Sequence, residues 1–385
     1  MMLLGRFYDA MELHRQDKII WARFLKPHRV LSTCRAAGGM QEGMEYLYNH
    51  QACEPTGHQR AMPASAWRDP QAYRRLIAET HGLPPESCVT LGTAANMHNA
   101  AVVRESFREH TVVAVVTGGV ETNAGRVGDP AMVYEHEGEF INLAAEKALP
   151  EGTINIMLFI AQELSPGAQV RCVVTATEAK TAALQELNVN SRYSSGLATG
   201  TGTDQVAVAC RLGTGVPLTG AGKHAKLGEL IGRAVKAGVM QALALQNKLT
   251  PPRQCSARIH LERFGADKQR MLEGVCAHLS PEQAELFRQN FSEIDRDPPT
   301  VAAMAALAHL WDKLSWGVLP PTCRPEIMGS YAAQVCAAVS GRYGKIEGYR
   351  RRLAPLPGQG SPDDLLELVF QALALGFADK WRYES

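Results

Sequence analysis

The sequence predicts an α/β or α+β fold, in which a mixed β-sheet with packed helices is followed by a C-terminal all-helical domain. Over residues 1–250, apolar runs rich in β-branched residues alternate with segments that carry helix-capping signals. Beyond Pro251 and Pro252, which interrupt any helix, the remaining segments have helical patterns. We therefore predict a first domain at 1–250 and a helical domain at 251–385.

Four strands are predicted in the first domain. The segments 110–119 and 152–161 are continuous apolar runs, which are typical of strands covered on both faces. Shorter apolar segments predict strands at 29–34 and 204–212. Because the apolar faces of such strands must be covered, we expect helices to pack on the sheet.

Three helices are predicted in the same domain. In the first, at 69–83, Asp69 is a candidate N-cap, Pro70 occupies the first turn and Gly82 closes the helix. The other two helices are predicted at 165–187, where a Ser-Pro pair gives the capping signal, and at 222–246. The C-terminal domain adds predicted helices at 280–291, 298–316, 327–343 and 361–381.

Composition limits the classes of function. The 385-residue chain has a formal net charge of +1 and no long run of one sign, which argues against nucleic acid or an anionic membrane as the main partner. Its nine cysteines include no CxxC pair, so we expect reduced thiols and no zinc site of that kind. The sequence lacks a run of about 20 apolar residues that would span a bilayer, and its N-terminus lacks a signal-peptide pattern. We therefore expect a cytoplasmic protein without membrane insertion.

The helix at 165–187 carries polar residues on the face that is predicted to point inward. At 100° per residue, this face contains Val170, Val173, Thr177, Lys180, Thr181 and Leu184. A lysine among apolar residues is costly to bury unless a carboxylate or a ligand meets it, which suggests a functional role for Lys180. Alternatively, its ammonium extends to water and the threonines bond to carbonyls of their own helix. Glu178 lies at the margin of this face and points away from Lys180.

The segment TGTGTD at 199–204 alternates threonine with glycine and ends in an aspartate that opens the next predicted strand. Gly200 and Gly202 let the backbone approach a ligand closely. Free N–H groups and hydroxyls in this loop are suited to hold an oxyanion, and Asp204 is suited to orient or activate a water. The alternative is an ordinary helix-to-strand turn with an aspartate cap. No lysine follows the second glycine, so this is not a GxxxxGK[ST] phosphate loop.

Polar residues at three further places are candidates for a site. The loop at 116–131, which follows a predicted buried strand, offers Asn123 as an amide donor and acceptor and Asp129 as a base, or is simply rich in turn residues. Asn155 interrupts an apolar strand, so we expect its amide to have a specific partner. His224 lies at a predicted helix N-terminus, where an anion is favoured, or is an exposed first-turn histidine.

Six segments, in this order along the chain, resemble the CbiZ family of adenosylcobinamide amidohydrolases: RVLSTCRAAGG, VTGGVETNAGRVGDPA, GTINIML, VTATEAKTAALQEL, ATGTGTDQVAVAC and GKHAKLGELIGRAV. The resemblance extends over residues 28–246. It implies a role in corrinoid salvage, in which the amide between the aminopropanol arm and the corrin ring of adenosylcobinamide, or of an adenosylated cobamide, is hydrolysed to give adenosylcobyric acid. The helical region after residue 255 lies outside the part that resembles the family.

Amide hydrolysis needs a nucleophile or an activated water, a group that stabilises the oxyanion, and an acid for the leaving amine. Asp204 or Glu178 is the candidate base, and Lys180 or the 199–203 loop the candidate oxyanion holder. Asn123 and Asn155 are candidates for positioning the amide. A nucleophilic hydroxyl with Lys180 as its base is the alternative, from Thr201, Thr203 or Ser32.

The candidate residues fall into two sets. The catalytic candidates are Glu178, Lys180, Asp204 and Asn123. The substrate-binding candidates are Thr199, Gly200, Thr201, Gly202, Thr203, Asn155, Asp129, His224 and Ser32. We expect Glu178 or Lys180 to lie within reach of a water from the 199–204 loop. No cofactor and no metal are required, although Asp129, Asp204, Glu178 and His224 together offer ligands for one.

Three other functions are compatible with the sequence. The chain is alternatively a corrinoid-binding or chaperone protein without hydrolysis, a hydrolase of an unrelated amide, or a nucleotide-phosphate binder that uses TGTGTD. The helical domain is expected to cap the corrinoid site or to form a homodimer, and its Trp311, Leu314 and Trp316 are equally suited to a plain core.

Overall fold

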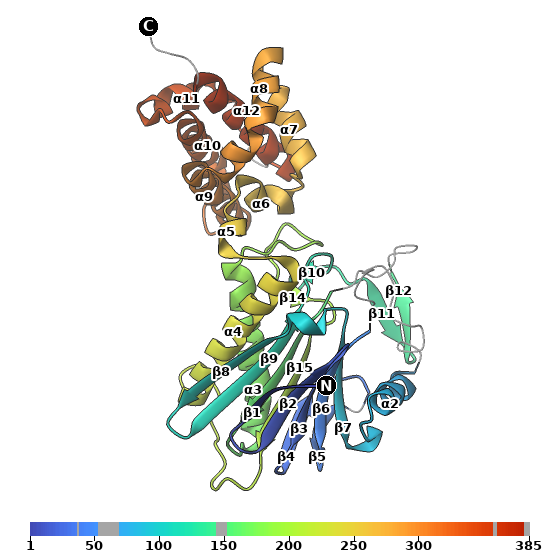
Figure 1. The fold of residues 1–385 in the computed structure, drawn as a ribbon. Coiled ribbons are helices and arrows are strands. Elements are labelled where there is room, and N and C mark those ends of the chain that lie inside the picture. Colours follow the sequence, from blue (N-terminus) through green and yellow to red (C-terminus); the bar gives the residue numbers. More distant parts are fainter. Residues whose placement is uncertain (37, 53–68, 144–151, 357–359, 381–385) are drawn as a thin grey trace. The chain divides into compact units, whose positions relative to one another are not determined.

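The computed structural model describes residues 1–385 except 37, 53–68, 144–151, 357–359 and 381–385. The chain divides into two compact units, Met1–Thr250 and Pro251–Ser385, which we describe separately (Figure 1). The predicted fold class is confirmed, because the first unit combines β-sheets with helices and the described part of the second unit is helical.

A six-stranded mixed sheet forms the centre of the first unit. Its order is β5-β4-β15-β13-β9-β8, with β13 and β15 parallel and the other neighbours antiparallel. The four predicted strands are its four central strands, whose buried faces explain why they contain many apolar residues. The bounds are β4 (His28–Ser32), β5 (Gly39–Glu42), β8 (Ala101–Phe107), β9 (His110–Gly118), β13 (Ile154–Ile160) and β15 (Gln205–Arg211).

A five-stranded sheet, which the sequence analysis did not predict, packs on the first sheet. Its order is β1-β2-β3-β6-β7, with β6 and β7 parallel and the other pairs antiparallel. The tight β1–β2 turn holds Tyr8 and Asp9 at positive φ. The bounds are β1 (Met2–Phe7), β2 (Met11–Gln16), β3 (Ile19–Phe24), β6 (Tyr46–Gln51) and β7 (Cys88–Thr93).

Helices cover both outer faces, so the first unit has four layers (Figure 1). Helices α3 (Pro166–Glu186) and α4 (Lys226–Asn247) pack on the six-stranded sheet through a shared apolar core. Helix α2 (Pro70–Thr80) packs its Ile77 and Ala78 on the outer face of the five-stranded sheet. The core between the two sheets contains Met11, Leu13, Ile20, Val113, Val115, Met157, Phe159, Ala207 and Ala209.

The predicted capping of α2 is confirmed, because the Asp69 carboxylate accepts a hydrogen bond from the Ala72 N–H and Pro70 begins the helix. The predicted inward face of α3 is wrong in phase. Val170 is 52% exposed, and Thr177 is exposed as well. The buried face consists mainly of small residues, which allow α3 to approach its neighbours closely: Ala168, Cys172, Ala176, Ala179 and Ala183. Lys180 and Leu184 are buried as predicted, because they lie where the predicted face borders the observed buried face.

Short elements complete the first unit. Two short strands, β10 (Ala124–Gly125) and β14 (Gly200–Thr201), pair antiparallel and join the loop after β9 to the loop before β15. A separate hairpin consists of β11 (Val133–His136) and β12 (Glu139–Asn142). The 3-10 turns are η1 (Pro85–Ser87) and η2 (Met97–Asn99).

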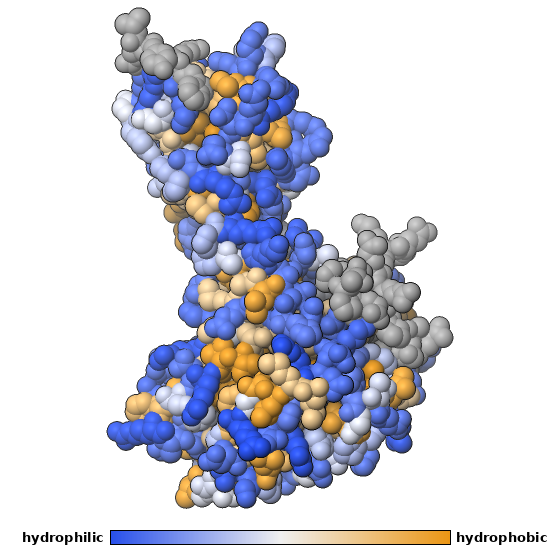
Figure 2. Space-filling model, in the orientation of Figure 1, coloured by the Kyte–Doolittle hydropathy of each residue, from blue (hydrophilic) through white to orange (hydrophobic). Residues whose placement is uncertain are grey.

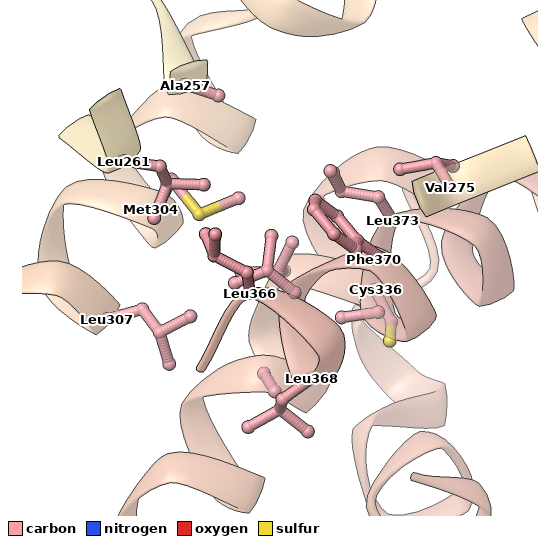
Figure 3. Packing of buried hydrophobic residues seen from close by; sticks show 14 of the residues in the cluster. Ala257, Leu261, Val275, Met304, Leu307, Cys336, Leu366, Leu368, Phe370 and Leu373 are labelled. Carbon is pink, nitrogen blue, oxygen red and sulfur yellow. The ribbon is translucent and has the colours of Figure 1, made fainter. Parts of the chain in front are cut away.

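The second unit is a bundle around α10 and α12, whose buried residues form one apolar core (Figure 3). Trp311 and Leu314 belong to this core, whereas Trp316 is exposed. The bounds are α5 (Pro251–Gln254), α6 (Ala257–Leu261), η3 (Glu262–Phe264), α7 (Lys268–Cys276), α8 (Pro281–Arg296), α9 (Pro298–Ser315), η4 (Pro321–Cys323), α10 (Arg324–Ser340), η5 (Tyr343–Lys345), α11 (Ile346–Arg352) and α12 (Pro362–Lys380).

Both units present a largely hydrophilic surface in the view of Figure 2, interrupted by apolar patches. Among the described helices, none combines the length and the hydropathy that crossing a bilayer requires.

Candidate active site

A buried ion pair joins helix α3 to the loop that precedes β15. Lys180 is 7% exposed, and its Nζ contacts Asp204 Oδ2. The small residues on α3 bring this helix close to the sheet, so the long lysine side chain reaches the start of β15. The expected proximity of Lys180 to the 199–204 loop is confirmed, and the contact is direct.

Asp204 accepts four hydrogen bonds. Its Oδ1 accepts from the Thr201 hydroxyl at 2.6 Å and from the Ile154 N–H at 2.8 Å. Its Oδ2 accepts from the Thr201 N–H at 3.0 Å and from Lys180. All four partners are donors, and an ionised carboxylate offers about four lone-pair positions. The carboxylate is therefore fixed in position beside one hydroxyl, that of Thr201.

The three threonines of the loop have different partners. The Thr199 hydroxyl accepts from the Val127 N–H at 2.8 Å. The Thr203 hydroxyl donates to the Gly152 carbonyl at 2.8 Å and lies 2.6 Å from the Thr153 hydroxyl. Thr201 is thus the loop threonine whose hydroxyl donates to a carboxylate.

Gly200 lies directly against the Lys180–Asp204 pair. A Cβ at this position would collide with Asp204 Oδ2 and lie 2.7 Å from Lys180 Nζ. At Gly202, two residues later, the nearest atom to such a Cβ is Asn123 Oδ1 at 3.7 Å, an ordinary contact distance. The first glycine is therefore needed for close approach, and the second is not.

Replacing Gly200 by alanine is expected to lower the free energy of unfolding by about 2 kcal/mol, because the added methyl group must displace the ion pair. Gly202→Ala is the matched control, with an expected change within about 0.5 kcal/mol. Urea denaturation of both variants and the wild type measures the difference. Equal stabilities of the two variants would contradict the tight packing at Gly200.

Asn123 is brought to the same place by the pairing of β10 with β14. It is 5% exposed, and its Nδ2 donates to the Gly152 carbonyl at 2.9 Å. Its Oδ1 accepts from the Tyr193 hydroxyl at 2.7 Å. Because Thr203 donates to the same carbonyl, the loops that contain Asn123, Gly152 and Thr203 converge at one point.

Glu178 and His224 do not join this cluster. The Glu178 side chain is 45% exposed and pairs with Lys223 at 3.1 Å. His224 is exposed in the loop before α4. Their sequence positions beside Lys180 and Lys226 do not bring them to Asp204, because helix geometry turns Glu178 away and α4 begins only at Lys226.

Asp129 lies near the cluster but has its own partners. It accepts hydrogen bonds from Ser191 at 2.6 Å and from the Arg126 N–H at 2.7 Å. Burial works to raise the pKa of Asp129, but the hydrogen bonds from Ser191, Ser194 and Arg126 outweigh it and hold the pKa below its ordinary value. This carboxylate therefore stabilises the loop after β10 through its hydrogen bonds.

Asn155 and Ser32 lie on the opposite face of the six-stranded sheet from α3. Successive residues of a strand point to opposite faces, so Asn155 faces the five-stranded sheet while Ile154 faces the helices. Asn155 Nδ2 donates to Asn49 Oδ1 and to the Gly92 carbonyl, both at 2.9 Å. The Ser32 hydroxyl is buried and has no partner among the described residues. Asn155 and Ser32 were predicted to belong to the same site as Lys180, and the structure does not bring them to it.

The candidate metal ligands do not gather. Asp129, Asp204 and Glu178 each have the separate partners given above. In the part of the chain that the structure describes, no three His, Cys, Asp or Glu side chains come together as a metal site.

Two residues of the cluster were missed by the sequence analysis: Tyr193 contacts Asn123, and Thr153 contacts Thr203. Thr181, which was placed on the polar face of the helix but not among the site candidates, donates its hydroxyl to the Thr199 carbonyl at 3.2 Å. The polar segment NSRYSSG at 190–196, placed between a helix and the TGTGTD loop, is the signal that would have indicated Tyr193.

The part of the chain that contains this cluster is similar to known proteins. The family model described as CbiZ, adenosylcobinamide amidohydrolase, matches residues 5–251. The chain is also 37% identical over 242 residues to an uncharacterized protein of Methanocaldococcus jannaschii, an alignment that covers 61% of this chain and 89% of that protein. The family match includes all residues of the cluster and ends where the helical unit begins.

Proposed function

The chain belongs to the CbiZ family of adenosylcobinamide amidohydrolases, and we propose that it hydrolyses the amide between the aminopropanol arm and the corrin ring of adenosylcobinamide. The products are adenosylcobyric acid and aminopropanol. The observation that carries this proposal is the contact of the Thr201 hydroxyl with the buried Asp204 carboxylate, which is paired with Lys180.

Thr201 is the proposed nucleophile. Its hydroxyl donates to Asp204 at 2.6 Å, the arrangement in which a carboxylate takes the proton of an attacking hydroxyl. The Thr203 hydroxyl donates instead to the Gly152 carbonyl, which is not a base. The buried Ser32 hydroxyl has no partner among the described residues. The hydrogen-bond partners therefore favour Thr201 over the other two hydroxyls.

The proposed reaction has two halves. Thr201 Oγ1 attacks the amide carbon while its proton passes to Asp204, and the carbonyl oxygen becomes an oxyanion. The carbon–nitrogen bond then breaks, the leaving nitrogen takes the proton from Asp204, and aminopropanol departs. The corrin acid remains as an ester on Thr201. A water, deprotonated by Asp204, hydrolyses this ester and restores the Thr201 hydroxyl.

Lys180 and Asn123 have supporting roles in this scheme. The ammonium of Lys180 fixes Asp204 so that its Oδ1 faces Thr201, and it supplies positive charge beside the reacting groups. Asn123 lies against Gly202, where an N–H donor stabilises the developing oxyanion. Each step uses side chains of this chain, so the proposed reaction requires no metal or other cofactor.

Incubation of the full chain with adenosylcobinamide tests the proposal, with chromatography and mass spectrometry of the products. We expect adenosylcobyric acid and aminopropanol in equal amounts, and the same yield after dialysis against EDTA. Corrinoid binding without product would favour a binding or chaperone protein instead. An unchanged corrinoid, together with turnover of another amide, would show that the protein hydrolyses an unrelated amide. Loss of turnover on dialysis, restored by added metal, would contradict the cofactor-free scheme.

A further inference from the structure

Tyr193 is held rigidly between two segments of the candidate site. The Arg192 N–H donates to the Ala124 carbonyl at 2.9 Å, which ties this loop to β10. The Tyr193 N–H donates to the Ser191 hydroxyl at 3.0 Å, and Ser191 in turn donates to Asp129. The backbone before the tyrosine ring is thus fixed to the loop that contains Asn123.

The Tyr193 ring packs on Gly125 of β10. A Cβ at Gly125 would lie 3.2 Å from Tyr193 Cδ2, closer than side chains usually pack, so the glycine allows the ring to lie against the strand. The ring leads its hydroxyl to Asn123, where the donated bond to Oδ1 is 2.7 Å. Packing and hydrogen bonding therefore define one position for the Tyr193 hydroxyl.

These contacts fix which way the Asn123 amide faces. With Oδ1 accepting from Tyr193, Nδ2 donates to the Gly152 carbonyl. Turning the amide over would set Oδ1 against that carbonyl, an unfavourable contact between two acceptors. Nδ2 carries a second hydrogen, which has no acceptor among the described residues. A Cβ built at Gly202 would lie 3.9 Å from Nδ2, so this side chain borders the TGTGTD loop.

Burial and the nearby Asp129 charge raise the pKa of Tyr193 above its ordinary value. The phenol therefore stays protonated at neutral pH and remains a donor to Asn123.

We propose that Tyr193 is a positioning residue: it holds the Asn123 amide so that the second N–H of Nδ2 is available to the oxyanion at the TGTGTD loop. The inference depends on the proposed amidase function. Tyr193 itself does not contact the reacting atoms in this scheme; its effect passes through Asn123.

A double-mutant cycle tests the role of Tyr193. We expect Tyr193→Phe to lower kcat about 10-fold with little change in KM, and Asn123→Ala to lower kcat about 100-fold, as for other oxyanion donors. In the double variant, the tyrosine change should cause no further loss of kcat, because the group that it positions is gone. Tyr48→Phe is the matched control, since it removes a phenol that donates to the Arg74 carbonyl elsewhere in the first unit. Its kcat should equal that of the wild type.

The side-chain amide signals of Asn123 in an NMR spectrum provide a measurement that needs no substrate. In the wild type, we expect two distinct NH₂ proton signals with slow hydrogen exchange. In Tyr193→Phe, faster hydrogen exchange and shifted positions of these signals are expected, because slow rotation about the amide C–N bond keeps the two protons distinct in either protein. Unchanged Asn123 signals, a wild-type kcat in Tyr193→Phe, or an independent loss in the double variant would each overturn the proposal. If the wild type releases no adenosylcobyric acid, the proposed function fails, and the NMR comparison alone decides whether Tyr193 holds Asn123.

Discussion

Replacing Thr201 by valine is expected to lower kcat for adenosylcobinamide roughly 10,000-fold or more, as the loss of a nucleophile does in other covalent hydrolases. Valine keeps the shape of threonine but has no hydroxyl to attack the amide or to donate to Asp204. Thr201→Ser keeps the hydroxyl and is expected to retain activity within about 10-fold. Product formation under saturating substrate measures both effects.

Thr203→Val is the matched control in the same loop. It removes the hydroxyl that donates to the Gly152 carbonyl, so a loss of about 1 kcal/mol of stability is expected. Its kcat should remain within about 10-fold of the wild type, because this hydroxyl faces no carboxylate in the hydrogen-bond pattern of the loop.

The mass of the protein during turnover distinguishes a covalent route from direct attack by water. Acid quenching of the wild type is expected to trap an ester, seen as an added corrinoid acyl mass on the peptide that contains Thr201. Thr201→Val should show no such adduct. A Thr201→Val variant with wild-type kcat would rule out Thr201 as the nucleophile and leave a water activated by Asp204.

The sequence predicted the strands of which both faces are buried. Strands β9 and β13 are covered on both faces, so each contains a run of five apolar residues, VVAVV in β9 and IMLFI in β13. Several strands of the second sheet are short segments that mix apolar and polar side chains, as in the MELHRQ of β2 and the YLYNHQ of β6. Partners far along the chain, such as β7 beside β6, determine that these short segments are strands.

The core of the candidate site was predictable for an electrostatic reason. A lysine in a mostly apolar helix needs an opposite charge, and the TGTGTD loop offered Asp204 nearby in the sequence. The phase of α3 was not predictable in the same way, since its buried face is made of alanines whose pattern is weaker than that of its valines.

The remaining site residues depend on geometry that the sequence does not express. Asn155 interrupts an apolar strand, and that signal was sound, but the alternation of side chains directs it to Asn49 and Gly92 between the sheets. Tyr193 lies in a loop without regular periodicity, and it reaches Asn123 through the bond of the Arg192 N–H to the Ala124 carbonyl and the packing of its ring on Gly125.

Replacing Asp204 by asparagine is expected to lower kcat by about 100- to 10,000-fold, the range typical of a lost general base. The amide cannot take the Thr201 proton, and its NH₂ group would oppose one of the donors that now meet the carboxylate. The variant also leaves the buried Lys180 ammonium without its counter-charge, so a loss of about 3 kcal/mol in unfolding free energy is expected. Steady-state kinetics and urea denaturation measure the two effects.

A second substitution separates catalysis from stability. In Asp204→Asn with Lys180→Met, the uncompensated charge is absent, so stability should recover in part while kcat stays low. Glu186→Gln on the same helix, whose side chain pairs with Lys236 at the surface, is the control with an expected change of less than about 1 kcal/mol.

Glu178→Gln decides between the two carboxylates that the sequence offered as the base. The Glu178 side chain is largely solvated and paired with Lys223, so we expect its removal to change kcat less than about 3-fold. A large loss of kcat in Glu178→Gln, together with a wild-type kcat in Asp204→Asn, would identify Glu178 on the surface of α3 as the base. The buried Thr201–Asp204–Lys180 contacts would then have a structural role alone.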